Sequence, residues 1–288
     1  MVAMEWKPTG EVNASREKNA IFDRVSIFMR LFLQPIGIWP LHTANYTSKT
    51  RFCLSVFCLT AVALVAGPHI YYVSFVMADT HVRIRHLPPI SFYSINTVKY
   101  VVFIMISGKF SAFVRLFARD WRSLVNEPRQ LSIMLNYTSK AKYLIVASII
   151  LLYGNAIPFI ILLPPMTKLV DEATNVTYRT LCYPGHYFDM IDPKQSQFTY
   201  SILYVVQTYF GFSLVTCTLG FLSVFVTFGL HVSARCNITS LLIQELVDDY
   251  SSARLKFIVG QHCQSLKYQT SISSEYFEFV ELFIYFLK

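Results

Sequence analysis

Tyrosine, asparagine, glutamine and threonine side chains recur within stretches that are otherwise strongly apolar. A phenol or an amide can orient a bound molecule by one or two hydrogen bonds, while apolar and aromatic neighbours bury the rest of it. The candidates for this chemistry are Tyr93, Asn96, Tyr100, Tyr153, Asn155, Tyr204, Gln207 and Thr208. The same residue types also join packed helices by hydrogen bonds. The pattern alone therefore leaves open both a small-molecule pocket and interhelical hydrogen bonding.

Spacings typical of enzymes and metal sites do not occur in the sequence. The 6 cysteines and 7 histidines are scattered, and no pair of cysteines has metal-ligand spacing. The chain has no His-Glu-x-x-His, no Gly-x-Ser-x-Gly and no glycine-rich phosphate loop. The sequence therefore predicts no enzyme, no metal site and no cofactor.

Long apolar helices are the elements that must position the polar candidates. Three stretches, Phe52 to Val76, Tyr143 to Thr167 and Gln195 to Ala234, contain no charged residue. Because a helix rises about 1.5 Å per residue, roughly 20 apolar residues cross the ~30 Å hydrocarbon core of a membrane. With 54% hydrophobic and only 15% charged residues, the chain is predicted to be an all-α, polytopic transmembrane helical bundle.

The predicted organisation has four parts. Residues 1–51 form a cytosolic N-terminus with an amphipathic helix at 20–34, and residues 52–230 form the transmembrane bundle. A cytosolic helical anchor region follows at 231–270, and residues 271–288 begin a fifth span. The four full spans are expected at about 52–76, 90–116, 143–164 and 198–230. The fourth apolar stretch is about 40 residues long, near 60 Å as a helix, so we expect its end to project into the cytosol.

The distribution of Lys and Arg predicts the orientation. With the N-terminus inside, the cytosolic segments 1–51, 109–142 and 231–267 hold 18 of the 25 basic residues, whereas the outside loops 77–89 and 165–197 hold 5. This bias is typical of cytosolic loops, and it accounts for the net charge of +8 without nucleic-acid binding. Of the glycosylation sequons, only Asn175 falls in an outside loop.

Several short segments resemble the insect odorant receptor family, in a hymenopteran-like form. One is Pro35-Ile36-Gly37-Ile38-Trp39-Pro40 after the amphipathic helix. Another is Asp120-Trp121 after the second span, with Met134 and Tyr137 downstream. The end of the long fourth helix, Gly229-Leu230-His231-Val232-Ser233, and the stretch from His262 to Leu287 complete the resemblance.

The resemblance implies a seven-span, odorant-binding subunit of a heteromeric ligand-gated cation channel. Such subunits act in sensory transduction in the plasma membrane of olfactory neurons. They form hetero-oligomers, expected to be tetramers, with a shared co-receptor subunit. Volatile odorants sit among the second, third, fourth and sixth helices in the outer half, and the seventh helix lines the pore. The candidates from Tyr93 to Thr208 fall at that depth.

The chain departs from the family pattern because it ends within the fifth span, so we expect this form to be C-terminally truncated and non-conducting. A G-protein-coupled-type chemoreceptor and a small-molecule membrane transporter remain as alternatives. The first would require an outside N-terminus, which the Lys and Arg bias opposes. The second would favour intramembrane acids, and the four full spans contain no Asp or Glu.

Overall fold

The computed structural model describes residues 9–41, 46–124, 127–171, 176–185 and 196–248, and further along the chain 250–253, 255–256, 258–260, 263 and 270. The expected start of a fifth span at 271–288 lies outside the described residues, as does Asn175.

The elements in chain order are α1 (Thr9–Leu33), α2 (Ser48–Tyr71), the π-helix η1 (Tyr72–Val76), α3 (Thr80–Arg85), α4 (Leu87–Met105), α5 (Ser107–Leu124), α6 (Pro128–Ile157), the π-helix η2 (Pro158–Leu162), α7 (Leu163–Met166), β1 (Lys168–Asp171), β2 (Val176–Arg179) and α8 (Gln197–Asp248).

The amphipathic helix begins earlier than the sequence suggests. It forms α1 from Thr9 to Leu33. Phe22, Val25 and Met29 are buried along one face, while Arg24 and Arg30 are exposed on the other. The sequence pattern detects only the half of the helix that has an apolar stripe, because the first turns carry mostly polar residues.

The expected second span at 90–116 is divided in the structure. The helix breaks at Ile106, so α4 ends at Met105 and α5 begins at Ser107. The neighbouring Ser107 and Gly108 are a physical reason for the break, since Gly and Ser pairs often accompany sharp helix kinks. By length and composition, three helical segments among the described residues could each cross a membrane, and a fourth is possible if the bent pair α4–α5 counts as one span. The three are Ser48–Val76, Pro128–Met166 and Gln197–Val247.

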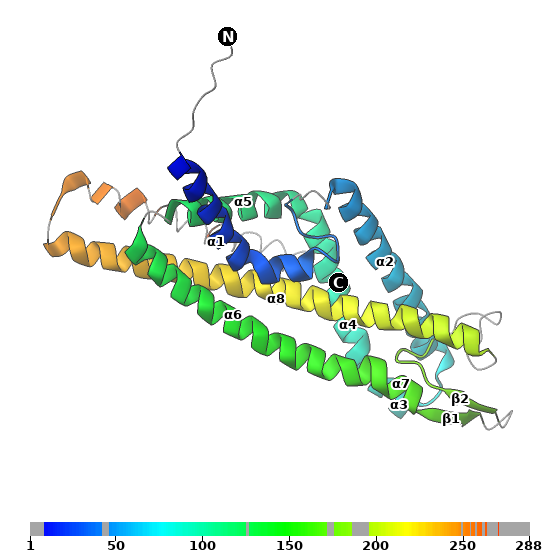
Figure 1. The fold of residues 1–288 in the computed structure, drawn as a ribbon. Helices are drawn as coiled ribbons and strands as arrows, with labels where there is room; N and C mark the ends of the chain where they lie inside the picture. The colour runs from blue at the N-terminus through cyan, green and yellow to red at the C-terminus, as the bar shows by residue number, and fades with distance from the viewer. Residues whose placement is uncertain are drawn as a thin grey trace, which may run out of the picture. The chain divides into compact units, whose positions relative to one another are not determined.

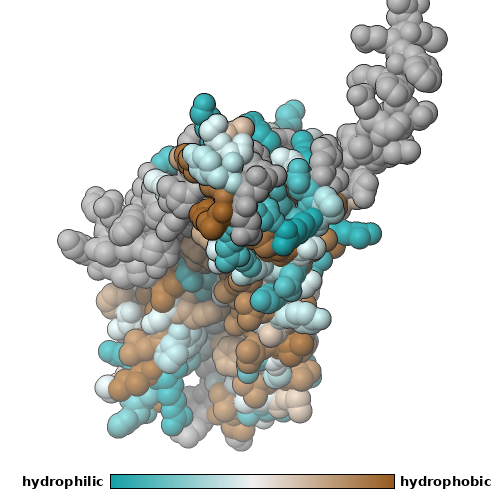
Figure 2. Space-filling model, turned by 90° about the vertical axis from the view of Figure 1, so that its left-hand side faces the viewer, coloured by the Kyte–Doolittle hydropathy of each residue, from teal (hydrophilic) through white to brown (hydrophobic). Residues whose placement is uncertain are grey.

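The fourth apolar stretch and the segment after it form one helix. Figure 1 shows α8 running without interruption. The helix has 52 residues and is about 78 Å long at the usual rise. This is more than twice the thickness of a hydrocarbon core. Hydrophobic residues are exposed over much of the face drawn in Figure 2. Exposed apolar side chains are also abundant on α2 and α6, among them Phe52, Leu64, Tyr143 and Ile150, as expected for helices that contact lipid.

The described chain consists of two compact units. One comprises residues 1–31, 106–145 and 222–288, and its core joins α1, α5 and α8 through Phe22, Phe117 and Phe228. The other comprises residues 32–105 and 146–221. We call them the α5 unit and the α4 unit. The α4 unit also contains two β-strands, which form the antiparallel hairpin β1–β2 in a stretch where the sequence suggests only a loop.

Candidate functional site

All eight predicted ligand-binding residues lie in the α4 unit, on α4, α6 and the first half of α8. They do not form one group. Gln207 and Phe210 of α8 contact partners on the α4 side, whereas Tyr204 contacts Ile161 of η2. Helix α8 thus separates the candidates into two sets. The sequence could not show this separation, because residues adjacent in a helix point about 100° apart.

The α4 side of α8 holds an aromatic cluster, formed by His69, Tyr93, Tyr183 and Phe210. The Tyr93 ring centroid lies 5.9 Å from those of His69 and Phe210 and 6.5 Å from that of Tyr183. Val65, Ala66 and Leu214 complete this buried core. The Tyr93 hydroxyl is buried and has no hydrogen-bond partner among the described residues. Because an unpaired buried hydroxyl costs about 1–3 kcal/mol, this group is available to a ligand or a water molecule.

Gln207 closes the aromatic cluster by holding the Tyr183 backbone. Its amide nitrogen donates to the Tyr183 carbonyl at 2.6 Å, and its Oε1 accepts from the Tyr183 N–H at 3.0 Å. Both bonds are buried. Gln207 is therefore a positioning residue that orders the segment around Tyr183, and its amide is less available to a ligand than its residue type suggests.

Two further candidates on α4 make hydrogen bonds within the protein. The Asn96 amide donates to the Phe92 carbonyl at 2.8 Å, and its Oδ1 accepts from the Thr218 hydroxyl at 2.7 Å. The Tyr100 hydroxyl donates to the Ile36 carbonyl at 2.7 Å. Seven residues separate Tyr100 from Tyr93, about 10 Å along the helix. Of these contacts, the one between Asn96 and Thr218 joins two helices, α4 and α8, as in the interhelical hydrogen bonding that the sequence left open.

The other side of α8 holds Tyr153, Tyr204 and Thr208. Tyr204 donates to the Ile161 carbonyl at 3.0 Å, and the Tyr153 hydroxyl lies 2.9 Å from that of Thr216. The Thr208 hydroxyl is buried without a partner among the described residues. Asn155 is exposed, and its amide donates to the Leu151 carbonyl of its own helix at 2.6 Å. Asn155 is therefore apart from both sets.

The structure places a second histidine, His86, against His69 of the aromatic cluster. His69 Nε2 of α2 lies 3.2 Å from His86 Nδ1, and the His69 ring also contacts Tyr183. In the sequence these histidines are 17 residues apart, a spacing with no helical or motif signal. Only the approach of α2 to the start of α4 brings them together.

The two ionisable side chains of residues 180–185, Cys182 and Tyr183, are uncharged at physiological pH. Burial raises the pKa of the Cys182 thiol to about 12, and the thiol donates to the Phe159 carbonyl at 2.9 Å. Burial also raises the pKa of the Tyr183 phenol, with a further contribution from Cys182 and Tyr93. No group of three or more His, Cys, Asp or Glu side chains that could hold a metal occurs in the part of the chain that the structure describes. The cluster is thus a mostly apolar, buried core that contains the unpartnered hydroxyl of Tyr93.

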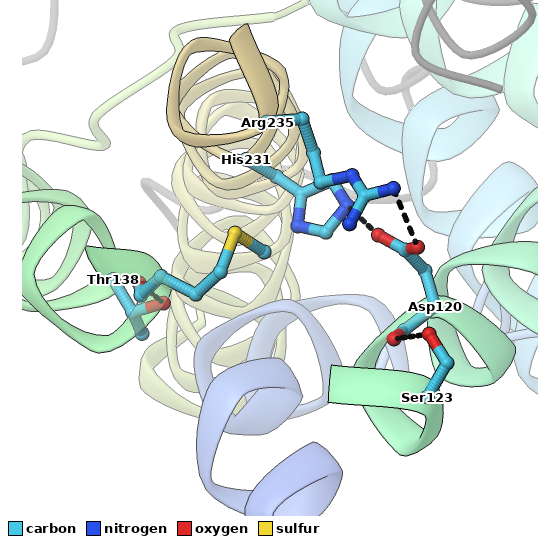
Figure 3. Close-up of polar contacts among 6 residues, drawn as sticks. Asp120, Ser123, Thr138, His231 and Arg235 are labelled. Atoms are coloured by element: carbon cyan, nitrogen blue, oxygen red, sulfur yellow. Dashed lines mark hydrogen bonds and ion pairs between the residues drawn. The ribbon is translucent and has the colours of Figure 1, made fainter. Parts of the chain in front are cut away.

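A second polar cluster lies in the α5 unit and is entirely buried (Figure 3). Asp120 of α5 faces two residues of α8, with Oδ2 2.8 Å from His231 Nε2 and Oδ1 3.7 Å from an Arg235 guanidinium nitrogen. The three side chains are at most 2% exposed. Ser123 donates to the Asp120 backbone carbonyl at 2.7 Å. This Asp120–His231–Arg235 cluster fixes α5 to α8, and sequence spacing could not have paired residues more than 100 positions apart.

The fold resembles solved insect olfactory receptors. The structure of the olfactory receptor OR5 from Machilis hrabei aligns with a TM-score of 0.68 and 14% identity, over 95% of this chain and 69% of that chain. The same receptor in complex with eugenol aligns with a TM-score of 0.70 and 15% identity, over 92% of this chain and 67% of that chain. At such identities the likeness establishes the fold alone. No curated protein sequence matches the chain significantly.

The family comparison is more specific than the fold. The model of the family described as 7tm odorant receptor matches residues 79–282. The match extends from the start of α3 to beyond α8 and includes the Asp120–His231–Arg235 cluster and most of the aromatic cluster. Since it covers more than half of the chain, the protein belongs to the 7tm odorant receptor family.

Proposed function

We propose that this protein is the odorant-binding subunit of a heteromeric ligand-gated cation channel in the plasma membrane of olfactory neurons. The observation that carries the proposal is the aromatic cluster of a 7tm odorant receptor chain, with the unpartnered, buried hydroxyl of Tyr93 at its centre. Its aromatic walls bury apolar surface, and one hydroxyl orients the ligand.

The ligand class is a small volatile molecule with an apolar body and a hydrogen-bonding group. Eugenol, which is bound in the similar Machilis receptor structure, is an aromatic molecule with one phenolic hydroxyl. It is therefore a suitable first probe for this chain. Charged side chains are absent from the aromatic cluster itself, so neutral volatiles should be favoured there over ions.

The channel is assembled with a shared co-receptor subunit of the same fold. The N-terminus of this chain lies in the cytosol. This orientation is favoured because it places 18 basic residues in cytosolic segments and only 5 in outside loops. In this arrangement residues 231–270, beginning with the last third of α8, belong to a cytosolic anchor region. The α4 unit then presents its hairpin and the Tyr183 segment toward the outside.

The test is co-expression of a form of this receptor that has all seven spans of the family with a family co-receptor, and recording of odorant-evoked currents. In a panel of odorants that includes eugenol, Phe210→Ala should raise the odorant concentration that evokes a half-maximal current at least tenfold, because it removes the ring that packs against Tyr93. Leu64→Ala, at an exposed position of α2, is the matched control and should change it less than twofold. Surface labelling of both variants separates loss of binding from loss of folding.

A ligand-binding assay on the purified chain provides a readout that does not depend on conduction. Odorants that evoke current should also raise the thermal unfolding temperature of the protein in detergent, since a ligand that binds only the folded state stabilises it. If Phe210→Ala and Leu64→Ala change the odorant-evoked current and the odorant-induced thermal shift by equal amounts, the proposed binding site is contradicted.

A further inference from the structure

Lys99 is a charged residue in the middle of an apolar helix. It lies twelve residues after the start of α4 and six before its end, and it is the only charged residue between Leu87 and Met105. It is partly buried. Ionisable residues within membrane helices are rare and mostly face a bundle interior, where they pair with a counter-ion or mark a ligand pathway.

The apolar stretches of the other membrane helices offer no counter-ion. No Asp or Glu occurs in residues 52–76, 87–105, 143–167 or 195–234. The one ring contact of the Lys99 ammonium among the described residues is with Phe221 of α8, whose ring centroid lies 5.2 Å from Nζ. A cation–π contact is weaker than the cost of placing a lysine at the centre of a membrane helix, so Phe221 offsets only part of that cost.

Lys99 continues the polar face of α4 that meets α8. Asn96, three residues before it, bonds Thr218, and Phe103, four residues after it, packs on Phe221 with ring centroids 5.4 Å apart. Residues three or four apart lie on the same face of a helix. Six residues, about 9 Å, separate Lys99 from Tyr93 on this helix. Lys99 therefore lies on the same helix as the unpartnered hydroxyl of the aromatic cluster, fewer than two turns further along.

We propose that Lys99 binds the carboxylate of hydrophobic acids, so that this receptor accepts acidic odorants as well as neutral ones. A carboxylate would supply the negative charge that the apolar parts of the membrane helices lack, and its alkyl chain would lie against the aromatic residues of α4 and α8. The inference rests on the proposed function, because it assigns a ligand class to the same unit. It goes further by naming the residue that selects for charge.

The experiment compares ligands that differ only in charge. Octanoic acid, its methyl ester and octanol are applied to cells that express the full chain with a co-receptor, at a pH where the acid is ionised. Lys99→Gln should raise the half-maximal concentration of the acid at least tenfold and change that of the ester and the alcohol less than threefold. Lys99→Arg, which keeps the charge, should stay within about threefold of the original protein for all three.

Lys140 supplies a matched control. Its ammonium also lies over an aromatic ring, that of Tyr137, at 4.9 Å, but it is exposed on α6. Lys140→Gln should leave all three half-maximal concentrations unchanged. If it shifts the acid as much as Lys99→Gln does, the effect comes from overall charge and the inference fails.

The remaining outcomes separate this inference from the proposed function. A protein that responds to octanol but never to the acid retains its odorant-binding function and overturns the assignment of Lys99. A Lys99→Gln variant that loses surface expression and all responses together would assign Lys99 to an ion pair or lipid contact, which also overturns it. No response to any odorant, and no thermal shift with any, contradicts the proposed function itself.

Discussion

At the scale of single residues, two tyrosines on one helix differ in what their hydroxyls do. Tyr93 has no partner for its buried hydroxyl, whereas Tyr100 donates to the Ile36 carbonyl. Tyr93→Phe should therefore leave the unfolding free energy unchanged or raise it slightly, and should weaken binding of hydroxyl-bearing odorants. Tyr100→Phe should lower the unfolding free energy by about 1 kcal/mol, because one net hydrogen bond is lost. Thermal unfolding in detergent with and without eugenol measures both.

The opposite pattern would contradict the assignment of Tyr93 to ligand binding. If Tyr93→Phe destabilises the protein as much as Tyr100→Phe and leaves odorant responses intact, its hydroxyl has a structural role. Both residues are buried tyrosines on the same helix, which makes them a matched pair.

Cys182 provides a test that depends on pH. Because burial raises the pKa of its thiol to about 12, the reactive thiolate is a negligible fraction at pH 8. We expect alkylation of Cys182 by iodoacetamide to be slow from pH 7 to pH 9 and to accelerate only as the pH approaches 12. Exposed Cys263 serves as the internal control, and mass spectrometry of the two peptides measures the ratio. Comparable rates at pH 8 would show that the loop does not bury the thiol.

The sequence identified residue types at this scale but not their partners. All eight candidates lie in one unit, yet Asn96 and Tyr100 are used in hydrogen bonds within the protein. His69 and Tyr183 carried no signal, because their positions depend on how α2 and the segment after β2 fold back on α4. Partner choice depends on tertiary packing, which residue type and helical spacing do not encode.

At the scale of elements, a buried charged cluster holds α5 against α8. Asp120→Ala leaves His231 and Arg235 buried without the carboxylate. Removal of one partner of a buried ion pair typically costs about 3–5 kcal/mol. We expect faster hydrogen exchange in α5 and reduced surface expression. Asp120→Ala combined with Arg235→Met should cost less than the sum of the two single changes, because the second removes an uncompensated charge. Additive losses would show that the two side chains do not interact.

The turn after α1 depends on a glycine. Gly37 has a φ of +78°, and a Cβ there would lie 2.6 Å from the Arg51 carbonyl oxygen. Gly37→Ala should lower the unfolding free energy by more than 2 kcal/mol, since it combines left-handed strain with a backbone clash. Gly229→Ala, inside α8 with nothing within 4 Å, should raise it by up to about 1 kcal/mol. Thermal unfolding of the two variants measures both changes. If Gly37→Ala and Gly229→Ala change the unfolding free energy equally, the turn at Gly37 does not have the geometry described.

The sequence predicted the helical elements better than their boundaries. Uninterrupted apolar stretches locate α2, the later part of α6 and α8, because long apolar periods are the strongest signal available. The break at Ile106 was missed, since the apolar pattern continues across Ser107 and Gly108. The hairpin β1–β2 was also missed, because two strands of 4 residues leave little periodicity.

At the scale of the whole molecule, topology is open to a direct test. If the N-terminus is cytosolic, the loop between α7 and α8 is outside and Asn175 is the sequon that becomes glycosylated. We expect one glycan, lost in Asn175→Gln and retained in the control Asn136→Gln. A mobility shift after endoglycosidase treatment measures it. A glycan on Asn13 or Asn136 would reverse the orientation and place the aromatic cluster on the cytosolic side.

The contact between Gln207 and Tyr183 also sets an order of events during synthesis. Tyr183 leaves the ribosome 27 residues before Phe210, so at about 5–20 residues per second it waits roughly one to five seconds for its partners. Helices α2 and α4 are already made by then, but the surface that Tyr183 and Phe210 complete is still open. The end of the α4 unit that holds the aromatic cluster is therefore finished late in biogenesis. Slowed translation between codons 184 and 207 would lengthen the time during which a chaperone must shield it.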